Sequence, residues 1–177
     1  MIPQNRPLDS PKTQKILCIQ NDTEAADRIA GELSGRGFDV IVVHDGHEGF
    51  VSILKSNPDL VLCHAGAPVI SGFELLARLI ELAPRLGLLP PFILLTALAD
   101  RDSELRARRL GADDYITEPI DFDILETIIK ARLAGVARNE VRPRHTDLND
   151  REIEVLTWAA RGKTSVQIAE MLGLAIP

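Results

Sequence analysis

The sequence has few cysteines and lacks long apolar segments. Its 177 residues include two cysteines, Cys18 and Cys63, each inside a short apolar run, so we expect two buried reduced thiols and not a disulfide framework. No apolar run reaches the roughly 18 residues that a membrane-spanning helix needs, and the polar stretch 1–15 lacks a signal-peptide core. We therefore expect a cytoplasmic protein with no membrane partner.

Positive charge is also scarce, with 20 Lys and Arg against 26 Asp and Glu and a formal net charge of -6. This balance excludes a globally basic nucleic-acid binder, because phosphate neutralisation needs clustered cations. The sequence shows no nucleophile-base pair, glycine-rich phosphate loop or metal constellation, so we expect neither an enzyme nor a cofactor. His44, His47 and His145 lack ligand-like spacing and are expected on the solvated surface.

Short apolar runs alternate with amphipathic stretches along most of the chain. The runs predict five buried parallel strands, and the stretches between and after them predict five helices. The predicted strands are Lys15–Ile19, Asp39–Val43, Leu60–Cys63, Phe92–Thr96 and Tyr115–Thr117, and the helices are Glu24–Arg36, His47–Ser56, Gly72–Leu82, Asp102–Leu110 and Asp123–Arg138. This order predicts an α/β fold, a doubly wound sheet with helices on both faces.

Three parts follow from the composition along the chain. We expect an α/β domain over residues 14–138, a polar linker over 139–147 that contains a proline, and a short all-α unit over 148–177. Helix punctuation agrees: Asp22 is a candidate N-cap of the first helix, and Gly111 is placed to end the fourth.

The segment 59–64 (Asp-Leu-Val-Leu-Cys-His), followed by Pro68 and by 71–75 (Ser-Gly-Phe-Glu-Leu), resembles the third strand and following loop of a response-regulator receiver domain. Gly111 and Pro119 fit the same pattern, and the resemblance covers about residues 15–138. It implies a five-stranded parallel sheet of order 2-1-3-4-5, with functional positions at the carboxyl ends of the strands.

The resemblance also assigns the positions of the phosphorylation site, and most of them have changed. His64 stands where receivers carry the phosphorylated aspartate. The other positions are Gln20 and Asn21 in place of the two acidic residues that hold Mg²⁺, Thr96 as the retained hydroxyl residue, Glu118 in place of a lysine, and Tyr115 as the retained switch aromatic. Neutral amides do not offset the charge of Mg²⁺, and a glutamate repels a phosphoryl group, so we expect a degenerate receiver without aspartyl phosphorylation.

The changes at positions 64 and 118 are opposite in sign. They suggest that His64 and Glu118 approach within about 4 Å or share a water, as a permanent pair that titrates near neutral pH. An equally weighted alternative is that His64 fills space passively. The resemblance further implies a cis peptide between Glu118 and Pro119.

Residues 148–177 resemble the opening of a LuxR-type helix-turn-helix domain. A first helix is capped by Asn149 or Asp150 and ended by Gly162, and Thr164 caps a second helix. The expected helix-turn-helix core comprises Leu156, Trp158, Ile168 and Leu172. The sequence stops at Pro177, before the recognition helix that would read base edges, so we expect DNA binding only if the chain continues.

These features lead to a bacterial response-regulator-like protein of transcription control whose receiver works without phosphorylation. The alternative is an adaptor that docks a sensor kinase or another regulator and binds no DNA. The short helical unit leaves an apolar stripe to cover, so we expect its two helices to pack on the receiver or on a second copy of the chain. A homodimer is the simpler solution, because receivers tend to pair through the fourth helix, fifth strand and fifth helix.

Overall fold

The computed structural model describes residues 12–97, 99–139 and 149–173. The elements in chain order are β1 (Lys15–Ile19), α1 (Thr23–Gly35), β2 (Asp39–Val43), α2 (Gly46–Ser56), β3 (Leu60–His64), α3 (Gly72–Leu86), β4 (Phe92–Thr96), α4 (Arg101–Leu110), β5 (Asp114–Thr117), α5 (Phe122–Asn139), α6 (Asp150–Ala160) and α7 (Ser165–Met171). The predicted linker lies outside the described residues, except Asn139, which ends α5. No helix among the described residues is long and apolar enough to cross a membrane.

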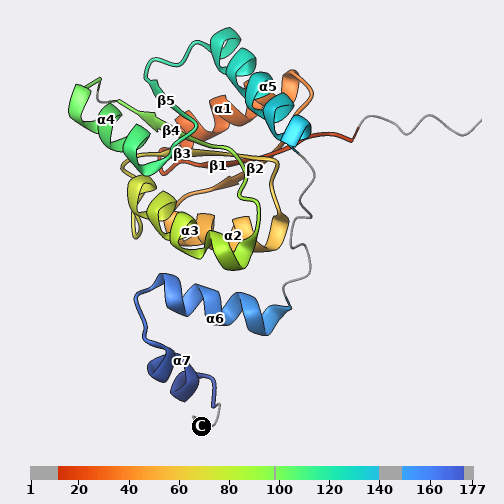
Figure 1. The fold of residues 1–177 in the computed structure, drawn as a ribbon. Helices are drawn as coiled ribbons and strands as arrows, with labels where there is room; N and C mark the ends of the chain where they lie inside the picture. Colours follow the sequence, from red (N-terminus) through yellow and green to blue (C-terminus); the bar gives the residue numbers. More distant parts are fainter. Residues whose placement is uncertain (1–11, 98, 140–148, 174–177) are drawn as a thin grey trace, which may run out of the picture.

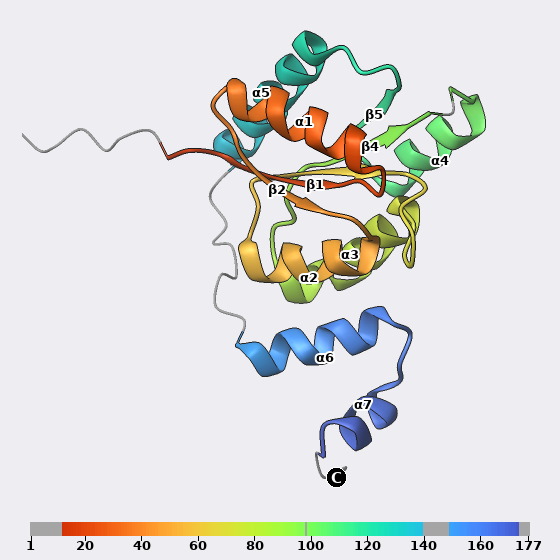
Figure 2. The same cartoon turned by 180° about the vertical axis from the view of Figure 1, so that it is seen from behind.

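The five strands form one parallel sheet of order β2-β1-β3-β4-β5, which confirms the predicted architecture. Helices α1 and α5 lie on one face of this sheet, and α2, α3 and α4 lie on the other (Figures 1 and 2). Helix α6 forms a further layer beyond α2 and α3, and α7 lies farther from the sheet (Figure 1). Because every strand runs the same way, all five carboxyl ends meet at one edge of the sheet.

The central strands are buried on both faces, so alternate side chains enter two separate cores. Cys18 packs with Ile29 and Leu33 on the side of α1 and α5, whereas Cys63 packs with Phe50 on the side of α2 and α3. Both cysteines are free and buried, as predicted. Burial raises the pKa of the Cys18 thiol to about 12 and also raises the pKa of Cys63, so both sulfurs are held as unreactive thiols.

Element boundaries agree with the sequence prediction to within one residue, except at the end of α3. This helix continues to Leu86, four residues beyond the predicted end at Leu82, and it passes through Pro84. Leu86 is buried in the core beneath α3, and this burial stabilises the extra turn of the helix. Pro84 lies in that last turn, where its missing N–H removes one hydrogen bond near the helix end.

The predicted N-caps are present. The Asp22 carboxylate accepts a hydrogen bond from the Ala25 N–H at 2.8 Å and begins α1. Reciprocal capping boxes begin α6, with Asn149 and Glu152, and α7, with Thr164 and Gln167. Both short helices therefore carry their own start signals in the sequence, and both form where the caps indicate.

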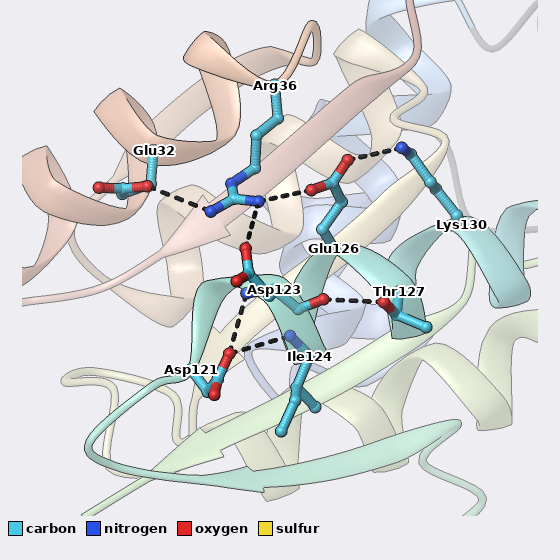
Figure 3. Close-up of polar contacts among 8 residues, drawn as sticks. All are labelled: Glu32, Arg36, Asp121, Asp123, Ile124, Glu126, Thr127 and Lys130. Carbon is cyan, nitrogen blue, oxygen red and sulfur yellow. Dashed lines mark hydrogen bonds and ion pairs between the residues drawn. The ribbon is translucent and has the colours of Figure 1, made fainter.

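A cluster of charged side chains joins the end of α1 to α5, on the face of the sheet that these two helices cover (Figure 3). The Arg36 guanidinium donates to the Asp123 carboxylate at 2.9 Å and to the Glu126 carboxylate at 2.5 Å. Lys130 donates to the second oxygen of Glu126, also at 2.5 Å. The Arg36 side chain is 24% exposed and that of Glu126 20%, so solvent screens this cluster less than an open surface pair. Lys130 and Arg36 together hold the pKa of the Glu126 carboxyl below its ordinary value of 4.5.

We predict that Glu126→Gln lowers the stability of the folded domain at neutral pH and flattens its loss of stability in acid. The lowered pKa means that Glu126 stabilises the fold above about pH 4.5, and that this contribution disappears as the pH falls through the lowered value. Urea unfolding midpoints measured from neutral pH down to about pH 3 test this. Glu81→Gln, on an exposed position of α3, is the control and should leave the pH profile unchanged. Identical profiles for the wild type and Glu126→Gln would contradict the prediction.

Candidate functional site

Polar side chains gather where the parallel strands end. Gln20 directly follows β1, His64 ends β3, Thr96 ends β4 and Glu118 directly follows β5. The Glu118 N–H donates to the Thr96 carbonyl at 2.8 Å, so the ends of β4 and β5 remain tied together at this edge. The sheet thus brings four of the predicted site residues to one edge, with Asn21 beside Gln20.

The residues at the end of β1 do not fit a Mg²⁺ ion. Gln20 is only 2% exposed, and its side-chain oxygen accepts the Asp22 N–H at 3.3 Å. Its carbonyl receives a hydrogen bond from Nδ1 of His44 at 3.0 Å. Asn21 is exposed, and the Asp22 carboxylate is engaged as the cap of α1. The described residues hold no group of three His, Cys, Asp or Glu side chains that could bind a metal.

The His64 ring folds back over its own loop. A Cβ placed on Gly66 would lie 3.3 Å from Cε1 and 3.6 Å from Nδ1 of His64, so the ring occupies the space that the glycine leaves open. Nδ1 is buried without a hydrogen-bond partner. The tight turn that follows, in which the Ala67 N–H donates to the His64 carbonyl at 3.1 Å, brings Gly66 under the ring.

The expected direct pair between His64 and Glu118 is not formed, and a pair that shares a water stays a prediction. Within the described part of the chain these two side chains form no hydrogen bond or ion pair, and Nδ1 of His64 has no partner at all. The ring turns toward Gly66, whereas Glu118 lies two strands away, after β5. The expected cis peptide between Glu118 and Pro119 is present.

Thr96 and Tyr115 lie where the sequence places them. Thr96 is buried at 5% exposure at the end of β4. Tyr115 is half-buried in β5 and packs against the core on the side of α2 and α3. A hydroxyl and an aromatic side chain therefore stand on neighbouring strands at this end of the sheet.

The predicted core of the C-terminal unit is only partly internal to that unit. Ile168 is buried at 6% exposure, and Leu172 is half-buried after α7. Leu156, by contrast, joins the core of the α/β domain together with Ala160. Trp158 is half-buried, with the Arg161 guanidinium carbon 4.8 Å from its ring centre. Of the two surfaces expected to cover the α6 stripe, the receiver and a second copy of the chain, the structure places Leu156 and Ala160 against the receiver.

His47 does not lie on the solvated surface, where the sequence predicts it. It is half-buried at the start of α2, with Nε2 2.7 Å from the Arg161 guanidinium. Its ring lies against α6, a neighbour 114 positions away along the chain. No local pattern around His47 signals such a contact.

The loop between β3 and α3 contains a strained residue beside this edge. Val69 has φ +67° and is 78% exposed, and the Ile70 N–H donates across it to the Pro68 carbonyl at 2.8 Å. This three-residue turn with positive φ is rare, and it is unfavourable for a β-branched side chain. A second hydrogen bond, from the Gly46 N–H to the Pro68 carbonyl at 3.1 Å, holds the turn against the start of α2.

Comparison with known proteins gives one consistent result. The sequence profile of the family described as Response regulator receiver domain matches residues 16–130. The chain is 35% identical over 118 residues to the transcriptional regulatory protein DltR of Streptococcus agalactiae, which covers 67% of this chain and 51% of that protein. It is 32% identical over 143 residues to the DNA-binding response regulator MtrA of Mycolicibacterium smegmatis, which covers 80% of this chain and 59% of that protein. The matches therefore span little more than half the length of these relatives.

Solved structures agree with the sequence comparisons. The receiver domain of a signal transduction histidine kinase from Syntrophus aciditrophicus superposes with a TM-score of 0.64 at 30% identity, covering 73% of this chain and 96% of that one. The N-terminal receiver domain of RstA from Klebsiella pneumoniae superposes with a TM-score of 0.63 at 28% identity, covering 68% and 98%.

We predict that Val69→Gly stabilises the domain by about 0.5 to 1 kcal/mol. Glycine removes a backbone penalty of roughly 1 to 2 kcal/mol at positive φ, and the entropy that it adds to the unfolded chain cancels part of the gain. Because Val69 is exposed, little packing is lost. The matched control is Ala134→Gly, at an exposed position inside α5, which should destabilise by about 1 kcal/mol. Urea unfolding measures the free energy of unfolding of both variants. A loss of stability in Val69→Gly would show that the backbone at Val69 is not strained.

Proposed function

Because this chain belongs to the response regulator receiver domain family, we propose that it is a cytoplasmic bacterial signalling and transcription regulator whose receiver works without aspartyl phosphorylation. The observation that carries the proposal is His64 at the end of β3, in the acceptor position, with its ring folded over Gly66. An imidazole there does not take the place of the acceptor carboxylate. The chain acts in this reading through contacts with partners and not as an enzyme.

The neighbouring residues support the same conclusion. Gln20 and Asn21 are neutral, and the Gln20 oxygen is already engaged by the Asp22 N–H. Glu118 adds negative charge where a phosphoryl group would need a cation. A phosphoryl group at this edge of the sheet would therefore lack its acceptor, its metal and its counter-charge together.

We further propose that residues 14–138 form the receiver, 139–147 a linker, and 148–177 the start of a LuxR-type helix-turn-helix domain. The two capping boxes and the buried Ile153 and Ile168 support this reading of α6 and α7. The named relatives DltR and MtrA are a transcriptional regulatory protein and a DNA-binding response regulator, which favours an output in transcription.

A second candidate function is an adaptor that docks a sensor kinase or another regulator without binding DNA. Charge favours it: residues 148–177 carry three basic side chains (Arg151, Arg161 and Lys163) and four acidic ones (Asp150, Glu152, Glu154 and Glu170), which sum to -1. This charge balance gives the unit little electrostatic attraction to the phosphate backbone of DNA.

We predict that the wild-type protein takes up no phosphoryl group from acetyl phosphate in the presence of Mg²⁺. The test is intact-mass spectrometry for an adduct of about 80 Da. A matched variant restores all four positions, with Gln20→Asp, Asn21→Asp, His64→Asp and Glu118→Lys, and should acquire the adduct. His64→Asp alone should remain nearly unlabelled, because it regains the acceptor without the metal site. An adduct mapped to a carboxylate at this edge of the wild-type sheet would overturn the proposal.

We also propose that the protein is a homodimer that pairs through α7, because the receiver already covers the apolar stripe of α6. Val166 and Met171 on α7 are 51% and 50% exposed, and a second copy would bury them. Light scattering at micromolar concentration should give about twice the 19.4 kDa chain mass. The double change Val166→Gln and Met171→Gln should give the single chain mass. A monomeric wild-type protein would refute the proposal.

A further inference from the structure

Helix α6 is docked on the receiver and is not free in solvent. Leu156 and Ala160 are 7% and 3% exposed, and they belong to the same hydrophobic core as Phe50 and Ile53 of α2. Figures 1 and 2 show α6 lying along the outer side of α2 and α3 from both directions. The receiver therefore has a docking surface for its own C-terminal helix, on the side opposite α1 and α5.

One polar contact joins the end of α6 to the start of α2. Nη2 of Arg161 lies 2.7 Å from Nε2 of His47. A guanidinium only donates hydrogen bonds, so Nε2 accepts and the imidazole is neutral, with its proton on Nδ1. That Nδ1 is buried and has no hydrogen-bond partner. Arg161 also lies over the Trp158 ring, which restricts its freedom to turn away from a charged His47.

The surroundings of His47 oppose a second proton. Burial lowers the pKa of His47 from its ordinary value of 6.5, and the positive charge of Arg161 lowers it further. Asp45 and Glu48, on the same end of α2, act in the opposite direction without cancelling these effects. The facing loop, residues 65–71, contains no titratable side chain. Protonated His47 would place two donors 2.7 Å apart, so the contact and the extra proton exclude each other.

The start of α2 also packs closely against the loop that follows His64. The Gly46 N–H donates to the Pro68 carbonyl at 3.1 Å. A Cβ placed on Gly46 would lie 1.9 Å from the Ile70 carbonyl oxygen, so no side chain fits between this loop and the helix. His47 is the residue after Gly46, so its contact with Arg161 lies one position from the contact between α2 and this loop.

We propose that the His47–Arg161 contact is a protonation-sensitive latch that holds α6 on the receiver and links it to the loop following His64. With His47 neutral the latch is closed, and protonation converts the hydrogen bond into a repulsion between two cations. The device uses no phosphoryl group, so it is independent of the function proposed above.

The sign of the pH dependence follows from the proton balance. Undocked His47 binds a proton with its ordinary pKa of 6.5, and docked His47 binds it more weakly. Docking is therefore strongest above pH 6.5 and weakens as the pH falls through that value toward the lowered one. The receiver core has no part in this step and should remain folded.

Hydrogen exchange of the α6 amides in the full chain tests the latch. Exchange is followed by mass spectrometry at about pH 7.5 and about pH 5.5, and the rates are corrected for the intrinsic effect of pH on amide exchange. We expect the protection of residues 153–160 to be about fivefold or more lower at the acid pH. The emission of Trp158, the only tryptophan in the sequence, should shift with the same midpoint. Peptides from β1, β3 and β4 should show no loss of protection, which separates undocking from unfolding.

Variants at His47 decide the mechanism. His47→Gln remains neutral and should abolish the pH dependence of α6 protection, whereas His47→Lys should leave α6 unprotected at both pH values. His44→Gln is the matched control, because His44 binds the Gln20 carbonyl and should leave the wild-type response intact. An unchanged pH response in His47→Gln, or α6 protection that is equal at both pH values in the wild type, would overturn the proposal.

Discussion

The burial of the central strands on both faces is the constraint on which the rest of the structure depends. Strands β1, β3 and β4 are apolar along nearly their whole length, and each enters one core on the side of α1 and α5 and another on the side of α2 and α3. Such a sheet tolerates polar side chains only where strands end. All five strands are parallel, so these tolerant positions meet at one edge, and this edge carries His64, Gln20 and Glu118.

This separation explains how the family fold can hold different side chains at this edge. Asn21 is exposed, and His64 and Glu118 are half-buried, so their replacement costs the cores nothing. Gln20 is the exception at 2% exposure, and its amide is compensated by the hydrogen bond from Asp22. Buried polar groups are tolerated when they are paired in this way. The structural glycine at position 72 is different: a Cβ there would lie 2.8 Å from the His64 carbonyl oxygen, so the scaffold requires this residue regardless of phosphorylation.

Most of the fold could be read from the sequence because its determinants are local. Apolar runs predicted the strands, and residues such as Asp22, Asn149 and Thr164 predicted helix starts, since a cap bonds to backbone only a few positions away. The misses depend on how side chains pack in three dimensions. The extra turn of α3 depends on the burial of Leu86, and the orientation of the His64 ring depends on the open space above Gly66. His47 was misplaced because its partner, Arg161, lies on another helix near the far end of the chain.

The docking of α6 is the part of the molecule best suited to regulation, because its stabilising terms are few. Burial of one leucine contributes roughly 1.5 to 3 kcal/mol, and Ala160 contributes less. The polar contact has an exposed partner in Arg161, so its contribution is at most on the order of 1 kcal/mol. The strands and helices of the receiver share far larger cores and are insensitive to a change of this size. An interface of this strength responds to the gain of a single proton, whereas the sheet beneath it does not. The proposed latch puts a change of charge at the start of α2, where it acts on α6 directly.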